Sequence, residues 1–163
     1  MTGRYAVDTS VTADRSRAEI ERTLTRYGAR GFMYGWDESQ AVLGFVVGGR
    51  QVRFVLPMPD RQAKEFTHTP GKGLLRSGQA AEAAYEQAVR QRWRALALVI
   101  KAKLEAVEAG IVTFDDEFLA HLVLPTGETV AQAIGPNVAE AYRTGAVPQM
   151  LPNYGTPAIE GPR

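Results

Sequence analysis

The chain has 163 residues, of which 45% are hydrophobic and 23% are charged, and its formal net charge is +1. This length and composition fit one globular domain that buries its own core, and the small net charge argues against a dedicated duplex-DNA binder. The absence of cysteine excludes disulfides and thiolate metal sites. No apolar run approaches the roughly 20 residues that span a bilayer. We therefore expect a cytoplasmic protein without a membrane partner.

The first expected elements are an arm and a helix. Residues 1–15 are polar and carry no signal-peptide core, which predicts a loose N-terminal arm. A capping-box pattern begins at Ser16, and apolar residues follow at helical spacing. Together these features predict a short amphipathic helix over residues 17–27, with Gly28 in the left-handed position that ends a helix.

The expected sheet is centred on a Gly-Gly dipeptide at residues 48–49. Two apolar runs, residues 41–47 and 50–56, flank this dipeptide, and two glycines suit a type I′ or II′ hairpin turn. Large aromatics alternate with smaller residues over 32–36, which predicts an earlier strand of the same sheet. The hairpin register then pairs Ala41 with Leu56, Leu43 with Phe54, Phe45 with Val52 and Val47 with Arg50.

A long loop and a long helix follow the hairpin. Pro57 ends the last strand, and a loop of about twenty residues, an uncommon length that is often functional, runs to Gln79. From Ala80 to Ala109, apolar residues recur every three or four positions, which predicts the central helix of the fold. Gly110 closes that helix.

Three short helices are expected in the C-terminal third of the chain. Thr113 begins the first, which Pro125 ends. Thr129 begins the second, which Pro136 ends, and a last helix finishes at Gly145.

These elements define the fold class and the domain organisation. We predict an α+β domain over residues 1–145, with a short helix, an antiparallel sheet of about three strands with a Gly-Gly hairpin, a long central helix and small C-terminal helices. Residues 146–163 are rich in proline and lack periodicity, so we expect a disordered tail.

The sequence contains three partial catalytic patterns, and each has a simpler interpretation. Glu117 and His121 stand four residues apart on a helix, but two ligands do not make a metal site. Asp60 could begin a nuclease motif, yet Glu65 lacks the lysine that should follow two positions later. The segment 71–73 is glycine-rich and basic, but it lacks the spacing of a phosphate-binding P-loop. We expect neither a metal nor another cofactor, and the sequence favours a protein that is not an enzyme.

Basic residues near aromatic residues remain as the candidate site. Cationic grooves with stacking aromatics are typical of proteins that hold single-stranded nucleic acid. The simpler alternatives are that the basic stripe of the long helix is its solvated side, and that the aromatic face of residues 32–36 is core. The candidate nucleic-acid-binding residues are Arg53, Arg61, Lys64, Lys72, Arg76, Arg90, Arg94 and Lys101.

The order of elements over residues 16–110 resembles the core of the Rad52-like single-strand annealing proteins. The stretches 90–96 and 124–130 also resemble those of small proteins of actinobacterial phages. The resemblance implies oligomeric rings that hold one strand in a basic groove, and a role in phage recombination. Single-stranded nucleic acid is therefore the expected partner, with a homo-oligomer as the expected assembly. The alternative is a structural or interaction protein, namely a phage assembly factor or an inhibitor of a host protein.

Overall fold

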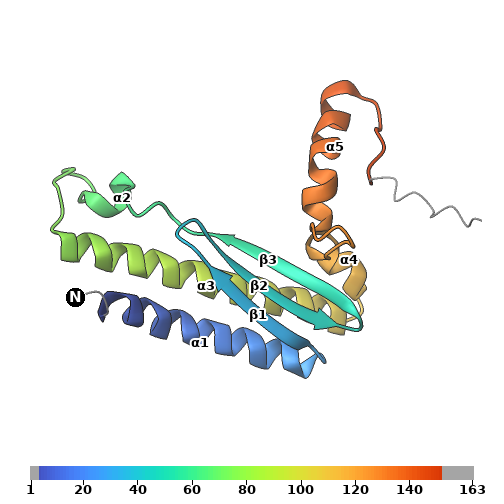
Figure 1. The fold of residues 1–163 in the computed structure, drawn as a ribbon, viewed down its shortest axis with the longest axis horizontal. Helices are drawn as coiled ribbons and strands as arrows, with labels where there is room; N and C mark the ends of the chain where they lie inside the picture. Colours follow the sequence, from blue (N-terminus) through green and yellow to red (C-terminus); the bar gives the residue numbers. More distant parts are fainter. Residues whose placement is uncertain (1–3, 152–163) are drawn as a thin grey trace, which may run out of the picture.

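The fold consists of two layers, a three-stranded antiparallel sheet and a pair of long helices that cover one of its faces (Figure 1). The computed structural model describes residues 4–151, with side chains described from residue 13 onward. The predicted α+β class is confirmed. In chain order the elements are α1 (Arg4–Arg26), β1 (Arg30–Trp36), β2 (Gln40–Val47), β3 (Arg50–Pro57), α2 (Lys64–Thr67), α3 (Gly78–Glu108), α4 (Phe114–Phe118), the 3-10 helix η1 (Leu119–His121) and α5 (Val130–Thr144).

The β2–β3 hairpin has the predicted turn and register. Gly48 and Gly49 both lie outside the strands with positive φ, at 55° and 77°, as a type I′ turn requires. Phe45 pairs with Val52, and every other predicted pair is also observed. Two glycines therefore determine which side chains of sixteen strand residues face the core.

The sheet has one buried and one open face. Phe45 and Phe54 lie on the buried face, with their ring centroids 6.4 Å apart, and Phe118 meets both edge-on. The other face carries Gly44 and Arg53, which pair directly across the two strands. β1 adds to the free edge of β2, so the strand order is β1-β2-β3.

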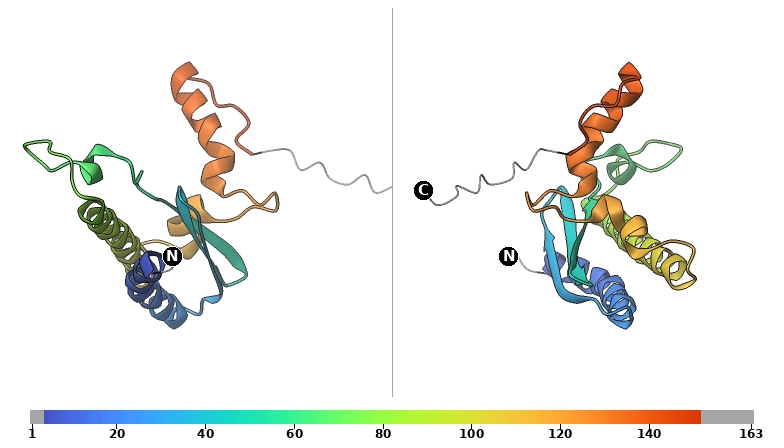
Figure 2. Two further views of the ribbon diagram at one scale, coloured as in Figure 1. Left: turned by 60° about the vertical axis from the view of Figure 1, so that its left-hand side comes forward. Right: turned by 90° about the vertical axis from the view of Figure 1, so that its right-hand side faces the viewer.

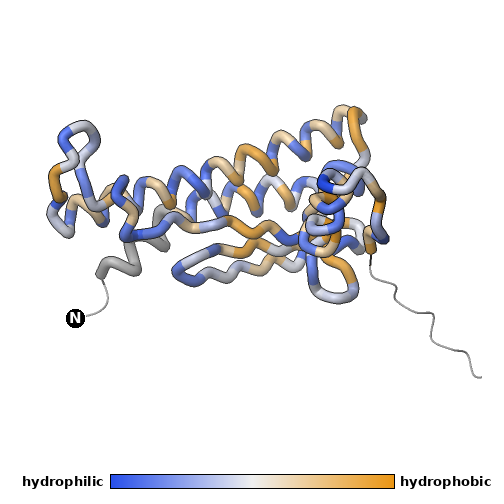
Figure 3. Tube along the Cα trace, turned by 90° about the horizontal axis from the view of Figure 1, so that it is seen from above, coloured by the Kyte–Doolittle hydropathy of each residue, from blue (hydrophilic) through white to orange (hydrophobic). Residues whose placement is uncertain are grey.

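The helix α3 is the spine of the core, as predicted. It begins two residues earlier than expected, because the Ser77 hydroxyl accepts a hydrogen bond from the amide of Ala80. In Figure 3, hydrophobic and hydrophilic segments alternate along its length. Its buried residues are Tyr85, Val89, Trp93, Leu96, Ala97, Ile100 and Leu104. No helix among the described residues is long and apolar enough to cross a membrane.

The helix α1 runs beside α3 in the same direction (Figure 1). Near their C-terminal ends, the Tyr27 hydroxyl donates a 2.6 Å hydrogen bond to the Glu108 carboxylate. This bond raises the pKa of Tyr27. Ile20 and Leu24 are fully buried between the helices and the sheet.

The start of α1 corrects the prediction for the N-terminus. The expected loose arm over residues 1–15 is helical from Arg4 onward, and Ser16 lies inside the helix rather than at its cap. The apolar stripe continues backward from Ile20 to Ala13, which is buried. Because Ala13 is small, this extension of the stripe gives only a weak signal in the sequence.

The connection between β3 and α3 contains more structure than the predicted loop. Phe66 on α2 is buried and meets Tyr85 edge-on, with their ring centroids 5.6 Å apart. A hairpin-like loop follows, which is closed where the amide of Arg76 donates to the carbonyl of Thr67 at 2.8 Å. Gly71 and Gly73 occupy positive φ in this loop, so these glycines shape the connection.

The C-terminal region packs on the edge of β3 and then leaves the body. The amide of Val123 donates to the carbonyl of Gln51 at 2.8 Å, and Thr129 caps α5 with the reciprocal bonds of a capping box. Figure 2 shows α5 projecting away from the sheet and the two long helices. The helix passes through Pro136, where a break was expected.

The helix α5 continues past Pro136, and the chain after it returns along the helix. A proline in a helix removes one hydrogen bond, and the bonds on either side continue α5 as far as Gly145, which ends it at φ 72°. Of the expected disordered tail, residues 146–151 lie within the described part and return along α5. There the Asn137 amide donates to the carbonyl of Gln149 at 2.7 Å. Residues 152–163 lie outside the described residues.

Candidate nucleic-acid interface

The eight predicted binding residues lie in three separate places. One lies on the open face of the sheet, four lie in the connection between β3 and α3, and three lie on one flank of α3. In that order they are Arg53, then Arg61, Lys64, Lys72 and Arg76, then Arg90, Arg94 and Lys101. The expectation that Arg53 shares a surface with the cations of α3 is wrong.

Arg53 is separated from α3 by the sheet itself. Its neighbours Val52 and Phe54 point into the core, so Arg53 points to the opposite face. Its guanidinium donates to the backbone carbonyl of Gly127 and, at 3.4 Å, to the side-chain oxygen of Gln132. Arg53 therefore fastens the segment before α5 to the sheet.

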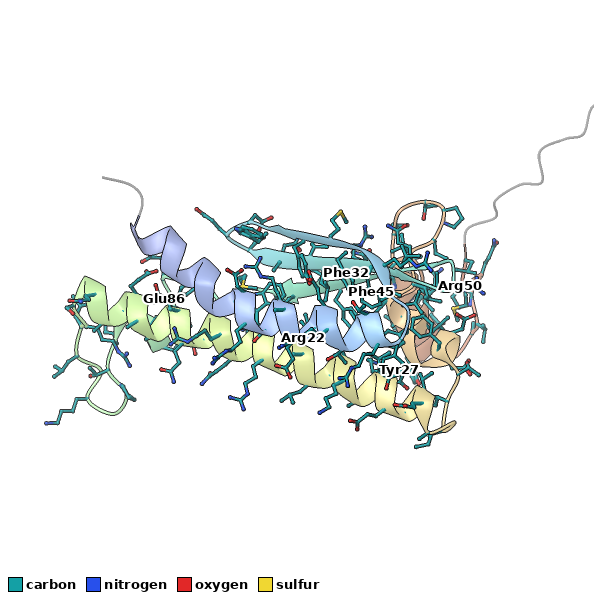
Figure 4. The ribbon with its side chains drawn as sticks, turned by 90° about the horizontal axis from the view of Figure 1, so that it is seen from below. Arg22, Tyr27, Phe32, Phe45, Arg50 and Glu86 are labelled. Carbon is teal, nitrogen blue, oxygen red and sulfur yellow. The ribbon has the colours of Figure 1, made fainter. Side chains whose placement is uncertain are left out.

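A basic surface lies on the outer side of the helical layer. Arg90, Arg94 and Lys101 fall within about 40° of one another on α3, on the flank that adjoins α1. Lys101 shares a shallow surface groove of about 580 Å³ with residues of α1, among them Arg22 and Arg26. Figure 4 shows Arg22 at the boundary between the two helices.

We call this surface the basic helical face, and α1 provides half of its cations. Arg15, Arg22 and Arg26 are exposed and fall within about 40° of one another, opposite the buried stripe of α1. The six cations of the face are Arg15, Arg22, Arg26, Arg90, Arg94 and Lys101.

The cations of the basic helical face form no salt bridge within the described part of the chain. Glu19 and Glu21 also line the groove, and Glu21 interacts with the Tyr34 hydroxyl. A surface on which cations outnumber the neighbouring carboxylates attracts anions, and a chain of phosphates is one such ligand.

The four cations of the β3–α3 connection do not form one surface. Arg76 is half-buried, and its Nε donates to the carbonyl of His68 at 3.1 Å. Lys64 and Lys72 are exposed. Arg61 points toward α3 and forms a salt bridge with Glu82, which raises its pKa.

The aromatic face of β1 is mostly core. Phe32 packs on Phe45 with their ring centroids 6.4 Å apart, and Tyr34 is half-buried. Burial, followed by a hydrogen bond with Glu21, raises the pKa of Tyr34. Trp36 differs from both, because 67% of its surface is exposed at the end of the strand.

Trp36 borders a cleft of about 480 Å³ between α1, α3 and the β1–β2 turn. We call it the aromatic cleft. Arg61 lies over the ring of Tyr85 at 4.1 Å, on the side of the cleft toward α2. On the side toward α1, Arg17 lies 5.2 Å from the Trp36 ring and 5.7 Å from the Trp93 ring. The cleft thus combines aromatic surfaces with guanidinium groups.

The sequence reasoning missed most of this cleft. The helix predicted over residues 17–27 gives Arg17 no binding role, and the aromatic pattern of residues 32–36 does not distinguish Trp36 from the aromatics that are core. The available signal was position, since Trp36 is the last aromatic of its strand and precedes the turn residue Asp37. Arg61 was selected for its charge alone.

Glu117 and His121, the possible pair of metal ligands, have other contacts. Glu117 accepts a 2.9 Å hydrogen bond from Lys103, and the ring of His121 stacks on Phe54 with a centroid distance of 3.9 Å. The described part of the chain contains no group of three or more side chains of the types that bind metal ions.

Comparison with known proteins gives no further guide to the site. No family model, curated protein or solved structure matches the chain.

Proposed function

We propose that this protein binds nucleic acid through the basic helical face. The observation that carries the proposal is that six cations on two adjacent helices lie without salt-bridge partners among the described residues. The net charge of the whole chain is only +1, so this concentration of charge is local. Phosphate contacts supply most of the affinity of non-specific nucleic-acid binding, and they need only such cations.

The spacing of the cations suits an extended anionic chain. At 1.5 Å per residue, Arg90 and Arg94 stand about 6 Å apart along α3, and Lys101 lies about 10 Å further on. On α1, Arg22 and Arg26 repeat the shorter interval. Because α1 and α3 are parallel, the two rows of cations run in the same direction.

The test is the salt dependence of oligonucleotide binding. The double variant Arg94→Gln, Lys101→Gln removes two exposed cations that lie off the buried stripe, so it should fold normally. For a single strand each lost phosphate contact lowers the slope of log K against log salt by about 0.7, so the double variant should lower it by about 1.4.

A matched control keeps the change in net charge the same. Arg30→Gln, Arg143→Gln removes two exposed cations from β1 and α5, away from the basic helical face, and should keep the parental slope. Equal slopes for both double variants would contradict the proposal, as would the absence of binding at low salt.

A specific observation supports the alternative, an interaction protein without catalytic activity. The open face of the sheet exposes Met33 by 53% of its surface, together with Val46 and Val55. Tyr142 on the projecting helix α5 is 88% exposed. Exposed apolar patches of this kind are typical of protein contacts. Such contacts release few counterions, so binding through them should depend weakly on salt.

A further inference from the structure

The aromatic cleft is a second feature that the basic helical face does not explain. It lies at the end of the sheet where the β1–β2 turn stands over the helices, and its volume of about 480 Å³ is within the range of small-ligand sites. Apolar side chains, among them Ala41, Met58 and Val89, line part of the wall. The described residues thus form a pocket that is both large and mostly apolar.

The charged groups of the cleft balance one another. Arg61 forms a salt bridge with Glu82, and Arg17 forms one with Asp14. Asp37 accepts hydrogen bonds from the backbone amide and hydroxyl of Ser39 at 2.7 Å, which lower its pKa and fix it in the turn. A strongly charged ligand would therefore gain little from the cleft. A neutral ligand with hydrogen-bonding edges would meet both donors and acceptors.

The aromatic side chains of the cleft favour a ligand with a flat ring. The Trp93 ring is buried in the wall, whereas the Trp36 ring is largely exposed at the mouth. Arg17 contacts both rings, so it holds their relative positions. An exposed indole beside a guanidinium offers a flat surface on which a planar ring can stack.

We propose that the aromatic cleft takes one unpaired base of a single-stranded nucleic acid, which stacks on Trp36. A nucleobase is neutral and planar, and it carries donors and acceptors on its edge, as the cleft requires. The proposal rests on the proposed function, because the basic helical face, on the outer side of the helices, would hold phosphates further along the same strand. It adds a preference for single strands, since the bases of a duplex are already stacked on one another.

The experiment compares Trp36→Leu with Tyr142→Leu, which removes another exposed aromatic residue from the distant helix α5. Binding of a short oligothymidylate and of a duplex with the same number of phosphates is measured across a salt series. Stacking of one base contributes about 1–3 kcal/mol, so Trp36→Leu should weaken single-strand binding roughly 5- to 150-fold. Its salt slope and its duplex affinity should stay at the parental values. Tyr142→Leu should leave all of these quantities unchanged.

Tryptophan fluorescence gives a direct second readout. The chain has two tryptophans, and Trp93 is only 4% exposed, so a stacked base should quench the emission of Trp36. Trp36→Phe keeps an aromatic surface and should restore most of the affinity that Trp36→Leu loses. Unchanged single-strand affinity in a folded Trp36→Leu variant would overturn this inference, and so would equal losses for single strand and duplex.

The two proposals fail in different ways. If Arg94→Gln, Lys101→Gln lowers the salt slope while Trp36→Leu has no effect, the basic helical face still binds phosphates and the base site is wrong. If the parental protein binds neither oligonucleotide at low salt, both proposals are wrong.

Discussion

The guanidinium of Arg53 donates a hydrogen bond to the backbone carbonyl of Gly127, 74 residues later in the chain. With the bond from Val123 to Gln51, it attaches the C-terminal segment to β3. Arg53→Met keeps the aliphatic stem and loses this bond, so it should lower the free energy of unfolding by about 1 kcal/mol.

Denaturant melts of Arg53→Met would measure that loss. The control is Arg50→Met, which breaks a half-exposed salt bridge with Asp115 and should cost clearly less than Arg53→Met, because solvent screens the pair. Because Arg53 lies across the sheet from the basic helical face, Arg53→Met should also keep the parental salt slope of oligonucleotide binding. A lower salt slope in Arg53→Met would show that Arg53 contacts the nucleic acid.

The hairpin turn gives a test of backbone conformation alone. Gly49 has φ 77°, and a Cβ built there meets no atom within 4 Å, so only backbone strain opposes a side chain. Gly49→Val should cost about 1–2 kcal/mol in unfolding free energy. Gly49→Asn should cost clearly less, since asparagine tolerates this region. Equal losses for the two variants would mean that strain is not the cause.

The long helix offers a pair of leucines two residues apart. Leu96 is buried, and Leu96→Ala should lower the free energy of unfolding by about 2–5 kcal/mol. Leu98 is 58% exposed on the outer side of α3, and Leu98→Ala should cost no more than about 0.5 kcal/mol. Urea melts of both variants check the orientation of the helix. A larger loss of stability in Leu98→Ala than in Leu96→Ala would contradict it.

His121 should make the fold sensitive to mild acid. Burial and the nearby charge of Lys103 lower the pKa of His121 from its ordinary value of 6.5. The unfolded chain therefore binds a proton more readily than the folded one. The contribution of neutral His121 to the free energy of unfolding is fully present above about pH 6.5. It is lost as the pH falls through the lower pKa of His121 in the folded state.

Urea melts between neutral pH and about pH 5 would measure this effect in the parent and in His121→Phe, which keeps a ring on Phe54. The variant should lose less stability over this interval than the parent does. The control is His68→Gln, which retains His121 and should behave as the parent does. A pH profile of His121→Phe that parallels the parental profile would contradict the assignment.

Local chemistry explains which parts of the fold could be predicted from the sequence. The register of β2 and β3 followed from Gly48 and Gly49, because a two-residue turn leaves one choice of pairs. The helix starts at Thr113 and Thr129 could be predicted for the same reason, since each cap bonds to an amide three positions later. Features of this kind need no knowledge of the rest of the chain.

The errors concern distant contacts. Ala13 lies in the core because α3 and the sheet cover it, and Pro136 remains within a helix whose neighbouring bonds persist. The partner of Arg53 lies 74 residues away, and its charge alone suggested an open binding surface. The aromatic cleft combines α1, the β1–β2 turn and α3, so no single stretch of sequence contains it.

The parallel arrangement of α1 and α3 has a consequence for folding kinetics. Three strands separate the two helices, and an odd number of antiparallel strands brings the chain back in its original direction. Tyr27 and Glu108, which join the helix ends, stand 81 residues apart. The helices α1 and α3 therefore cannot pack as a local helical hairpin. The chain between them must first be closed into a long loop, which costs entropy before any contact between the helices compensates for it. We therefore expect refolding at the millisecond pace of mixed α/β domains rather than that of helical bundles.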